Sequence, residues 1–87
     1  MENRDDRGAP KRKPLEQLLA ELAEIRPHVG RPFVHAKSGQ TFQLLFGAFD
    51  EHSNEFLAVY CLLAHPALKF TRPMSEFLEK FEPGHGI

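Results

Sequence analysis

The chain has 87 residues, of which 41% are hydrophobic, with eight phenylalanines and no tryptophan. This length holds one domain, and a polar N-terminal stretch leaves about 60 residues for a core, a size that buries only ~60% of the unfolded surface. No apolar run approaches the ~20 residues that span a bilayer, and the first residues lack the apolar core of a signal peptide. We therefore expect a small cytoplasmic domain with no membrane partner.

Charge is distributed unevenly along the chain. Residues 1–13 carry five basic and three acidic side chains, whereas the rest of the chain carries six basic and nine acidic ones. The body therefore lacks the cationic surface that general binding to a phosphate backbone requires. Weak binding of single-stranded nucleic acid stays open as an alternative, through the basic tail together with Lys37, Lys69 and Arg72.

The N-terminal part predicts a tail and a helix. Residues 1–13 bury too little apolar surface to become ordered and are expected to form a flexible charged tail. Pro14 suits the first position of an amphipathic helix over 14–26, and Pro27 is expected to move Arg26 out of helical dihedrals and so to end it. The apolar face of this helix recurs at helical spacing: Leu15, Leu18, Leu19, Leu22 and Ile25.

Short apolar segments separated by turn residues predict a small β domain over 31–82. Pro73 suits the start of a short helical segment, which carries Met74, Phe77, Leu78 and Phe81, and residues 83–87 are expected to be a flexible end. We expect four strands, joined by a tight turn at 37–40, a polar connection at 50–54 and a loop at 64–67; the strands are 31–37, 41–49, 55–63 and 68–72.

The side-chain patterns of the second and third strands predict which of their faces are buried. In the second strand, alternation predicts that one face is the core face, formed by Phe42, Leu44, Phe46 and Ala48. The third strand is apolar on both faces and therefore needs two covers. One cover is the inside of a curled sheet. The other is either the leucine face of the N-terminal helix or the same surface of a second subunit.

The second half of the chain resembles a small bacterial family described as domain of unknown function 1653. The resemblance covers roughly 50 residues and lies in ordered short motifs. These are His35-x-Lys37 with Gly39, Phe42-x-Leu44, His52-Ser53-x-Glu55, Val59-Tyr60 with Leu63, and Phe70-x-Arg72-Pro73 with Phe77. It implies a strongly bent antiparallel sheet like that of the Src-homology-three barrels, and it implies no activity.

The sequence departs from this family pattern at three positions. Ala36 and Cys61 stand where an aromatic residue and an arginine are expected, and Phe70 replaces a tryptophan. A ligand contact from an arginine in the third strand is therefore in doubt here. The expected fold class is α+β and mostly β: an N-terminal amphipathic helix, then a small bent antiparallel sheet or Src-homology-three-like barrel of four to five strands.

Six polar residues near the ends of the expected strands are candidate ligand-binding residues: His35, Lys37, His52, Ser53, Tyr60 and Arg72. By alternation His35 and Lys37 share one side of the first strand, where they can present an imidazole and a cation to an anionic ligand. The alternative for this pair is a solvated strand face.

Arg72 has two possible roles. Its guanidinium can clamp a phosphate or carboxylate in a bidentate fork, or it can have a structural role by pairing with Glu76 or Glu79. Tyr60 alternates with core residues, so its ring is expected in the core and its hydroxyl on a polar partner, either Arg72 or His35.

His52 and Ser53 are followed by a carboxylate, which invites comparison with a hydrolase. Adjacent Ser and His side chains rarely place the imidazole on the hydroxyl, and serine residues in loops usually bond their own backbone. The five histidines lie in separate segments without the spacing of metal ligands, and Cys61 lies in an apolar run as an expected core residue. No metal, cofactor or catalytic residue is predicted.

These features favour a non-catalytic binding module for a small anionic ligand or a protein segment. The first alternative is an oligomerisation or assembly protein, in which Leu15, Leu18, Leu19, Leu22 and Ile25 join a partner helix, for example in a homodimer. The second alternative is the weak binding of single-stranded nucleic acid, against which the acidic body argues.

Overall fold

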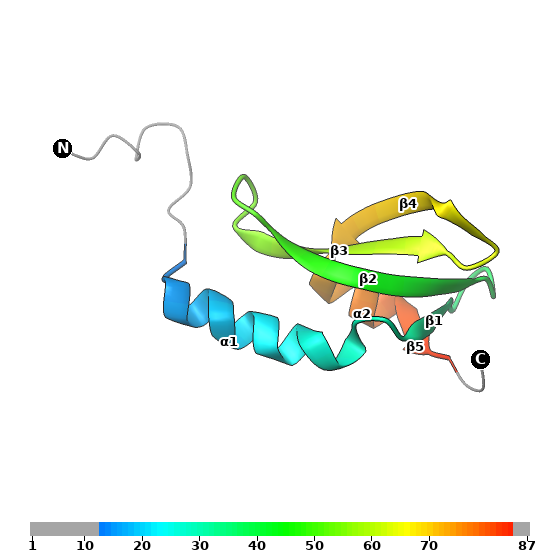
Figure 1. Cartoon of the computed structure of the whole chain (residues 1–87), viewed down its shortest axis with the longest axis horizontal. Helices are drawn as coiled ribbons and strands as arrows, with labels where there is room; N and C mark the ends of the chain where they lie inside the picture. The colour runs from blue at the N-terminus through cyan, green and yellow to red at the C-terminus, as the bar shows by residue number, and fades with distance from the viewer. Residues whose placement is uncertain (1–12, 85–87) are drawn as a thin grey trace.

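A computed structural model describes residues 13–84, so residues 1–12 of the predicted tail and 85–87 of the predicted flexible end lie outside the described range. Figure 1 shows two α-helices against one curved sheet. The elements in chain order are α1 (Leu15–Ile25), the short 3-10 helix η2 (Arg26–His28), β1 (Pro32–His35), β2 (Thr41–Asp50), β3 (Glu55–Leu62), β4 (His65–Pro73), α2 (Met74–Lys80) and β5 (Phe81–Pro83).

The five strands form one antiparallel sheet in the order β4-β3-β2-β1-β5. The sheet is not closed into a barrel, so β4 and β5 are its edges. It nevertheless curls strongly enough for side chains of both edges to meet, since Cζ of Arg72 in β4 lies 5.2 Å from the ring centre of Phe81 in β5. The predicted class, a helix followed by a small bent antiparallel sheet, is confirmed.

The core is largely aromatic and lies on the concave side of the sheet. Phe33, Leu44 and Phe77 are its largest fully buried side chains. The ring of Phe77 meets Phe33 edge to face at 5.0 Å and stacks on Phe81 at 4.3 Å. Such ring pairs add about 0.5–1.5 kcal/mol each beyond the burial of their area. Aromatic packing therefore ties α2 and β5 to the sheet.

Helix α1 differs from its prediction at both ends. Pro14 precedes the helix as its N-cap residue instead of starting it. Arg26 keeps right-handed helical dihedrals, φ −54° and ψ −39°, although a proline follows it. The prediction that Pro27 moves Arg26 out of this region was wrong, because the restriction before proline is a bias and the chain continues as one turn of 3-10 helix.

A β-bulge in β2 reverses the predicted alternation. The pairing with β3 shifts between Leu44 and Phe46, so Leu45 is the extra residue. Beyond it, Gly47 and Phe49 lie on the core side, because they pair with Ala58 and Phe56. Phe46 and Ala48 therefore lie on the outer face instead of the predicted core face, and the side chain of Phe46 is 51% exposed.

Helices α1 and α2 lie on the same side of the sheet, below β2 in the view of Figure 1. The end of α1 packs there through Ile25, whose Cγ2 lies 3.3 Å from the position that a Cβ on Gly47 would take. Helix α1 therefore adds to the core on the concave side. The expectation that its leucine face covers the second face of β3 was wrong. On that second face Leu57 and Val59 are half-buried.

The C-terminal third also differs from its predicted boundaries. The predicted loop at 64–67 is a tighter turn, and β4 already begins at His65 and includes Pro66. Proline is tolerated there because β4 is an edge strand that has a free side for the missing N–H. Phe81 starts β5 instead of continuing the helix, and β5 pairs with β1. Within residues 13–84, no helix is long and apolar enough to cross a membrane.

Candidate functional site

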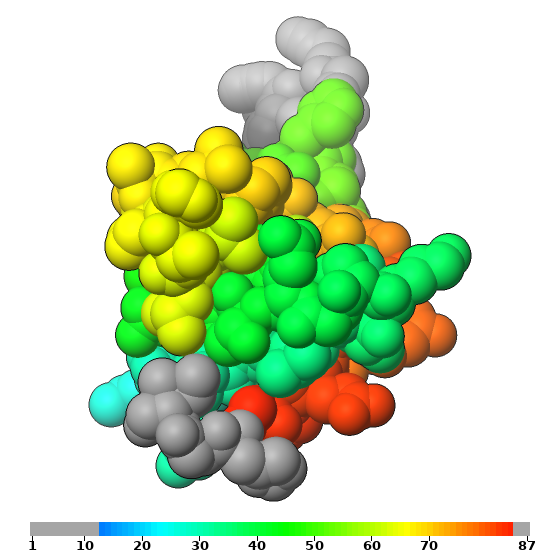
Figure 2. Space-filling model, turned by 90° about the vertical axis from the view of Figure 1, so that its right-hand side faces the viewer, coloured from blue at the N-terminus to red at the C-terminus, as the bar shows by residue number. Residues whose placement is uncertain are grey.

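A pocket of about 280 Å³ is lined by residues of the β1–β2 turn and of all five strands. Figure 2 shows the end of the molecule at which the β1–β2 turn and the β3–β4 turn lie. Three of the six predicted ligand-binding residues line the pocket, and each comes from a different strand. They are His35 from β1, Tyr60 from β3 and Arg72 from β4. The remaining lining residues are Ser38, Gln40, Phe42, Phe70 and Phe81.

The aromatic wall of the pocket follows from strand register. Tyr60 pairs directly with Phe70 across β3 and β4, and their rings stack at 5.7 Å. Phe42 on the neighbouring strand meets both rings edge to face, at 5.5 Å from Tyr60 and 5.8 Å from Phe70. Phe81 closes the wall against Tyr60 at 5.3 Å. The wall is rigid because every ring is held by at least one other ring.

Arg72 is held at the rim by three contacts. Its Nε donates a hydrogen bond of 2.9 Å to the hydroxyl of Tyr60, and its guanidinium lies over the ring of Phe81. Its Nη1 lies 3.7 Å from Oε2 of Glu76, in the first turn of α2, in a partly exposed ion pair. The sequence left open whether Arg72 or His35 bonds Tyr60, and the structure identifies Arg72.

His35 is fixed by the tight turn that follows it. The backbone N–H of Ser38 donates to Nδ1 of His35 at 3.3 Å, and the Ser38 hydroxyl lies 3.0 Å from the same atom. These contacts occupy Nδ1 and leave Nε2 without a hydrogen bond within residues 13–84. The ring also packs against Phe81 at 4.8 Å.

The polar groups of the pocket are mostly hydrogen-bond donors. The Tyr60 hydroxyl accepts from Arg72, which leaves its own proton for another acceptor. The Nη groups of Arg72 and Nε2 of His35 make no hydrogen bond within residues 13–84. An aromatic pocket with the Arg72 guanidinium and the Tyr60 hydroxyl proton at its rim is complementary to an acceptor, such as a carboxylate or phosphate oxygen.

The other three predicted residues do not line this pocket. Lys37 belongs to the turn after β1, and it lines a neighbouring depression together with His35, Ala36, Glu79 and Lys80. His52 and Ser53 lie in the β2–β3 turn, at the opposite end of β2 from the residues that line the pocket.

Local hydrogen bonds explain the β2–β3 turn. The backbone N–H of His52 and the hydroxyl of Ser53 both donate to the carboxylate of Asp50, at 3.1 and 2.8 Å. These donors hold the pKa of Asp50 below its ordinary value, with the Ser53 hydroxyl as the largest cause. Asn54 adopts a positive φ of 63°, which asparagine tolerates in turns. Ser53 therefore bonds Asp50 and not the imidazole that a hydrolase would require.

Cys61 is buried and pairs with Gln43 and Lys69 in the sheet. It alternates with Tyr60 and so lies on the opposite face from the pocket. Cys61 does not line the pocket.

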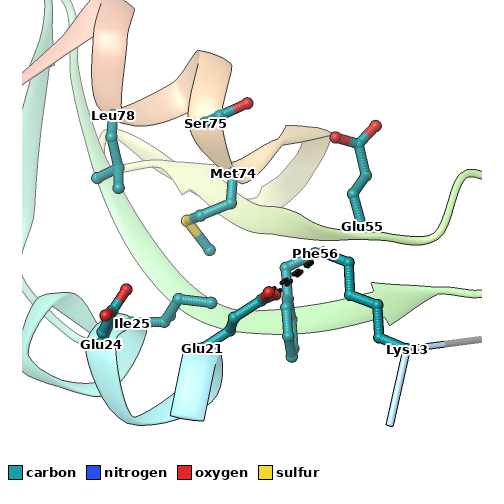
Figure 3. Close-up of a pocket in the computed structure, with 9 residues that line it drawn as sticks. All are labelled: Lys13, Glu21, Glu24, Ile25, Glu55, Phe56, Met74, Ser75 and Leu78. Carbon is teal, nitrogen blue, oxygen red and sulfur yellow. Dashed lines mark hydrogen bonds and ion pairs between the residues drawn. The ribbon is translucent and has the colours of Figure 1, made fainter. Parts of the chain in front are cut away.

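A second, larger cavity was not foreseen from the sequence. It is a groove of about 390 Å³ between α1 and α2, over the start of β3 (Figure 3). Its apolar floor is formed by Ile25, Phe56, Met74 and Leu78, which point toward one another in the close-up. Gly47 lies beneath, since a Cβ there would be 3.2 Å from Cε of Met74 and 3.3 Å from Ile25.

The rim of this groove is charged. Glu21 and Glu24 come from α1, and Glu55 comes from the start of β3. Lys13 reaches across to Glu21, with Nζ at 3.2 and 3.3 Å from the two carboxylate oxygens. Glu24 and Glu55 make no ion pair with any residue between 13 and 84. Periodicity alone does not reveal this groove, because its walls lie far apart in the sequence.

Fold and pocket together define a small α+β domain with an open five-stranded antiparallel sheet and a donor-lined aromatic pocket at one end. We compared the chain with protein families, with curated proteins and with solved structures, and none of the three comparisons gave a match. The resemblance to the domain of unknown function 1653 therefore stays a prediction.

Proposed function

We propose that this domain is a non-catalytic binding module whose aromatic pocket holds a small anionic ligand, a carboxylate or a phosphate ester. The observation that carries the proposal is the convergence of Arg72, Tyr60 and His35 on one pocket, where the Nη groups of Arg72 and the hydroxyl proton of Tyr60 make no hydrogen bond within residues 13–84. Charge-assisted hydrogen bonds to an anion are stronger than neutral ones, which favours an anionic ligand over a neutral one.

Glu76 has a definite role in this proposal. Its carboxylate is the only anionic group that the structure places in an ion pair with Arg72, at 3.7 Å within residues 13–84. An entering carboxylate or phosphate competes with Glu76 for the guanidinium. Two single substitutions are thus expected to have opposite effects on anion affinity, which a general loss of structure cannot produce.

A titration followed by amide chemical shifts tests this function, with benzoate and inorganic phosphate as probes and benzamide as the neutral analogue. We expect saturable shifts around Ser38, Tyr60 and Arg72 with the anions, and weak shifts with benzamide. Arg72→Gln should weaken anion binding about tenfold or more, because hydrogen bonds to charged groups contribute about 1.5–3 kcal/mol. Glu76→Gln should strengthen binding by a few fold, the scale of an exposed ion pair.

Arg31→Gln is the matched control, because it removes the same charge from an exposed residue outside the pocket. It should leave the affinity nearly unchanged. Equal losses in Arg72→Gln and Arg31→Gln, or shifts confined to the β2–β3 turn at the other end of the molecule, would reject the pocket as the anion site.

Assembly through α1 is the second candidate function, and the exposure of its leucines favours it. Leu15 is 68% exposed and Leu19 is 56% exposed, whereas only Ile25 of this helix is buried. Leu18 and Leu22 are half-buried. Part of the apolar stripe of α1 therefore has no partner within the described domain, as a helix that joins a second helix would show before assembly.

A further inference from the structure

The groove between α1 and α2 offers a second surface, distinct from the anion pocket. We propose that it is a docking site for a basic amphipathic segment of a partner protein, in which an apolar side chain enters the groove and flanking Lys or Arg residues meet its acidic rim. The inference is independent of the proposed pocket function, because no residue lines both cavities.

Apolar contact is the first requirement that the groove meets. Four apolar side chains from three elements form its floor: Ile25, Phe56, Met74 and Leu78. Leu78 is 41% exposed at the lip, whereas Ile25 and Met74 are anchored in the core. Because Gly47 carries no side chain, Ile25 and Met74 sit deep against β2 and the groove keeps its depth. An apolar side chain of a partner would cover surface that now faces water.

Charge complementarity identifies the chemistry of the occupant. The carboxylates of Glu21 and Glu24 on one wall and of Glu55 on another surround an apolar floor, and Glu24 and Glu55 have no cationic partner between residues 13 and 84. Lys13 shows how such a rim accepts an ammonium, since its Nζ contacts both carboxylate oxygens of Glu21. A segment with Lys or Arg residues beside an apolar side chain can contact the apolar floor and the acidic rim at the same time.

A polypeptide fits this arrangement better than a simple cation does. Helices laid in grooves bind through apolar anchors at helical spacing, with polar residues along their edges. Carboxylates that stand on separate walls, about an apolar floor, match that pattern. A small polyamine would satisfy only the rim and would leave the exposed part of Leu78 uncovered.

The test uses the full chain and three synthetic peptides. One peptide has leucines at helical spacing with lysines between them, the second replaces the lysines by glutamates, and the third replaces the leucines by serines. Binding is measured by titration calorimetry and by amide chemical shifts. We expect saturable binding of the leucine-lysine peptide only, with shifts at Ile25, Phe56 and Leu78, and weaker binding at higher salt.

Two pairs of variants separate docking from general attraction to an acidic protein. Glu24→Gln with Glu55→Gln should weaken binding about three- to tenfold, whereas Glu79→Gln with Glu82→Gln removes the same charge outside the groove and should have little effect. Leu78→Ala should weaken binding, whereas Leu68→Ala, at a leucine of β4 that is also exposed and lies outside the groove, should not.

Three outcomes would overturn the proposal. The first is equal binding of the lysine and glutamate peptides, and the second is an equal effect of the two glutamine pairs. The third is self-association of the unliganded chain in sedimentation that Glu24→Gln with Glu55→Gln abolishes, which would assign the groove to a second copy of this chain. None of these results bears on the anion pocket, since its variants and probes are different.

Discussion

The Tyr60–Arg72 hydrogen bond links the core to the candidate site. Tyr60 is buried, and its phenol would lack a partner among the described residues without the Nε of Arg72 at 2.9 Å. In return, the bond holds the guanidinium at the pocket rim, over the ring of Phe81. A buried polar group without a partner is costly, so this one contact stabilises the fold and orients the site.

We predict that Tyr60→Phe lowers the free energy of unfolding by about 0.5–1.5 kcal/mol, the usual contribution of a hydrogen bond. In an Arg72→Met background the same substitution should cost clearly less, because the partner is already gone. Urea unfolding of the four proteins in this double-mutant cycle measures the difference. An equal cost of Tyr60→Phe in both backgrounds would show that the two side chains are not coupled.

Residue-level predictions succeeded where simple alternation applied. Alternation predicts that the ring of Tyr60 lies in the core with its hydroxyl on Arg72 or His35, and the structure shows a buried Tyr60 bonded to Arg72. Phe70, two residues before Arg72 on the same face, was missed although this spacing already signals it. Strand alternation does not apply to Lys37 because β1 ends at His35, although both residues line one depression beside the pocket.

At the scale of elements, a bulge and a glycine in β2 determine which side chains of this strand face the core and how closely the helices approach it. The extra residue at Leu45 moves Phe46 outward and brings Gly47 to the core side. Sequence patterns cannot show this shift, because a single inserted residue leaves the apolar character of the strand unchanged. Alternation thus failed in the second half of β2, while the existence of α1, β2, β3 and α2 was foreseen from periodicity and turn residues.

Substitutions of Gly47 test whether the helices depend on a close approach to β2. A Cβ there would lie 3.2 Å from Cε of Met74 and 3.3 Å from Cγ2 of Ile25. The Met74 methyl can shift, and alanine restricts the unfolded chain, so Gly47→Ala should change stability by less than about 1 kcal/mol. Gly47→Val overfills the space and should cost about 1–3 kcal/mol.

Thermal unfolding of the two variants beside the parent protein gives both values. Ala48→Val on the outer face of the same strand is the matched control, because it adds methyl groups where no helix packs. It should have little effect on stability. A Gly47→Val protein as stable as its parent would show that α1 and α2 do not depend on close approach to β2.

Over the whole molecule, packing is one-sided. Both helices and the aromatic core lie on the concave side of the sheet, whereas Phe46 on the outer face and Leu15 on α1 stay exposed. Sequence periodicity gave the leucine stripe of α1 but not how much of it the domain would cover. That quantity depends on the angle at which α1 leaves the sheet, and Ile25 and η2 at its C-terminal end set this angle.

If the exposed leucines join a partner, the chain should self-associate through them. We expect sedimentation of the full chain to show a concentration-dependent dimer that Leu15→Gln with Leu19→Gln converts to monomer without loss of unfolding free energy, since neither side chain is buried. Truncation before Gly30 is a poorer test because it also removes Ile25 from the core. A parent chain that sediments as a monomer at every concentration would exclude self-association through α1.

The two edge strands of the open sheet, β4 and β5, carry features that prevent uncontrolled polymerisation. An unpaired border strand offers a template on which another chain can add, and repetition of that step builds fibrils. In β4 the prolines at 66 and 73 cannot donate to an incoming strand, and Lys69 brings a charge between them. The opposite border, β5, spans only Phe81–Pro83 and ends in another proline. Replacement of Pro66 and Lys69 is therefore expected to cause aggregation during long storage, under conditions in which the native fold itself is unchanged.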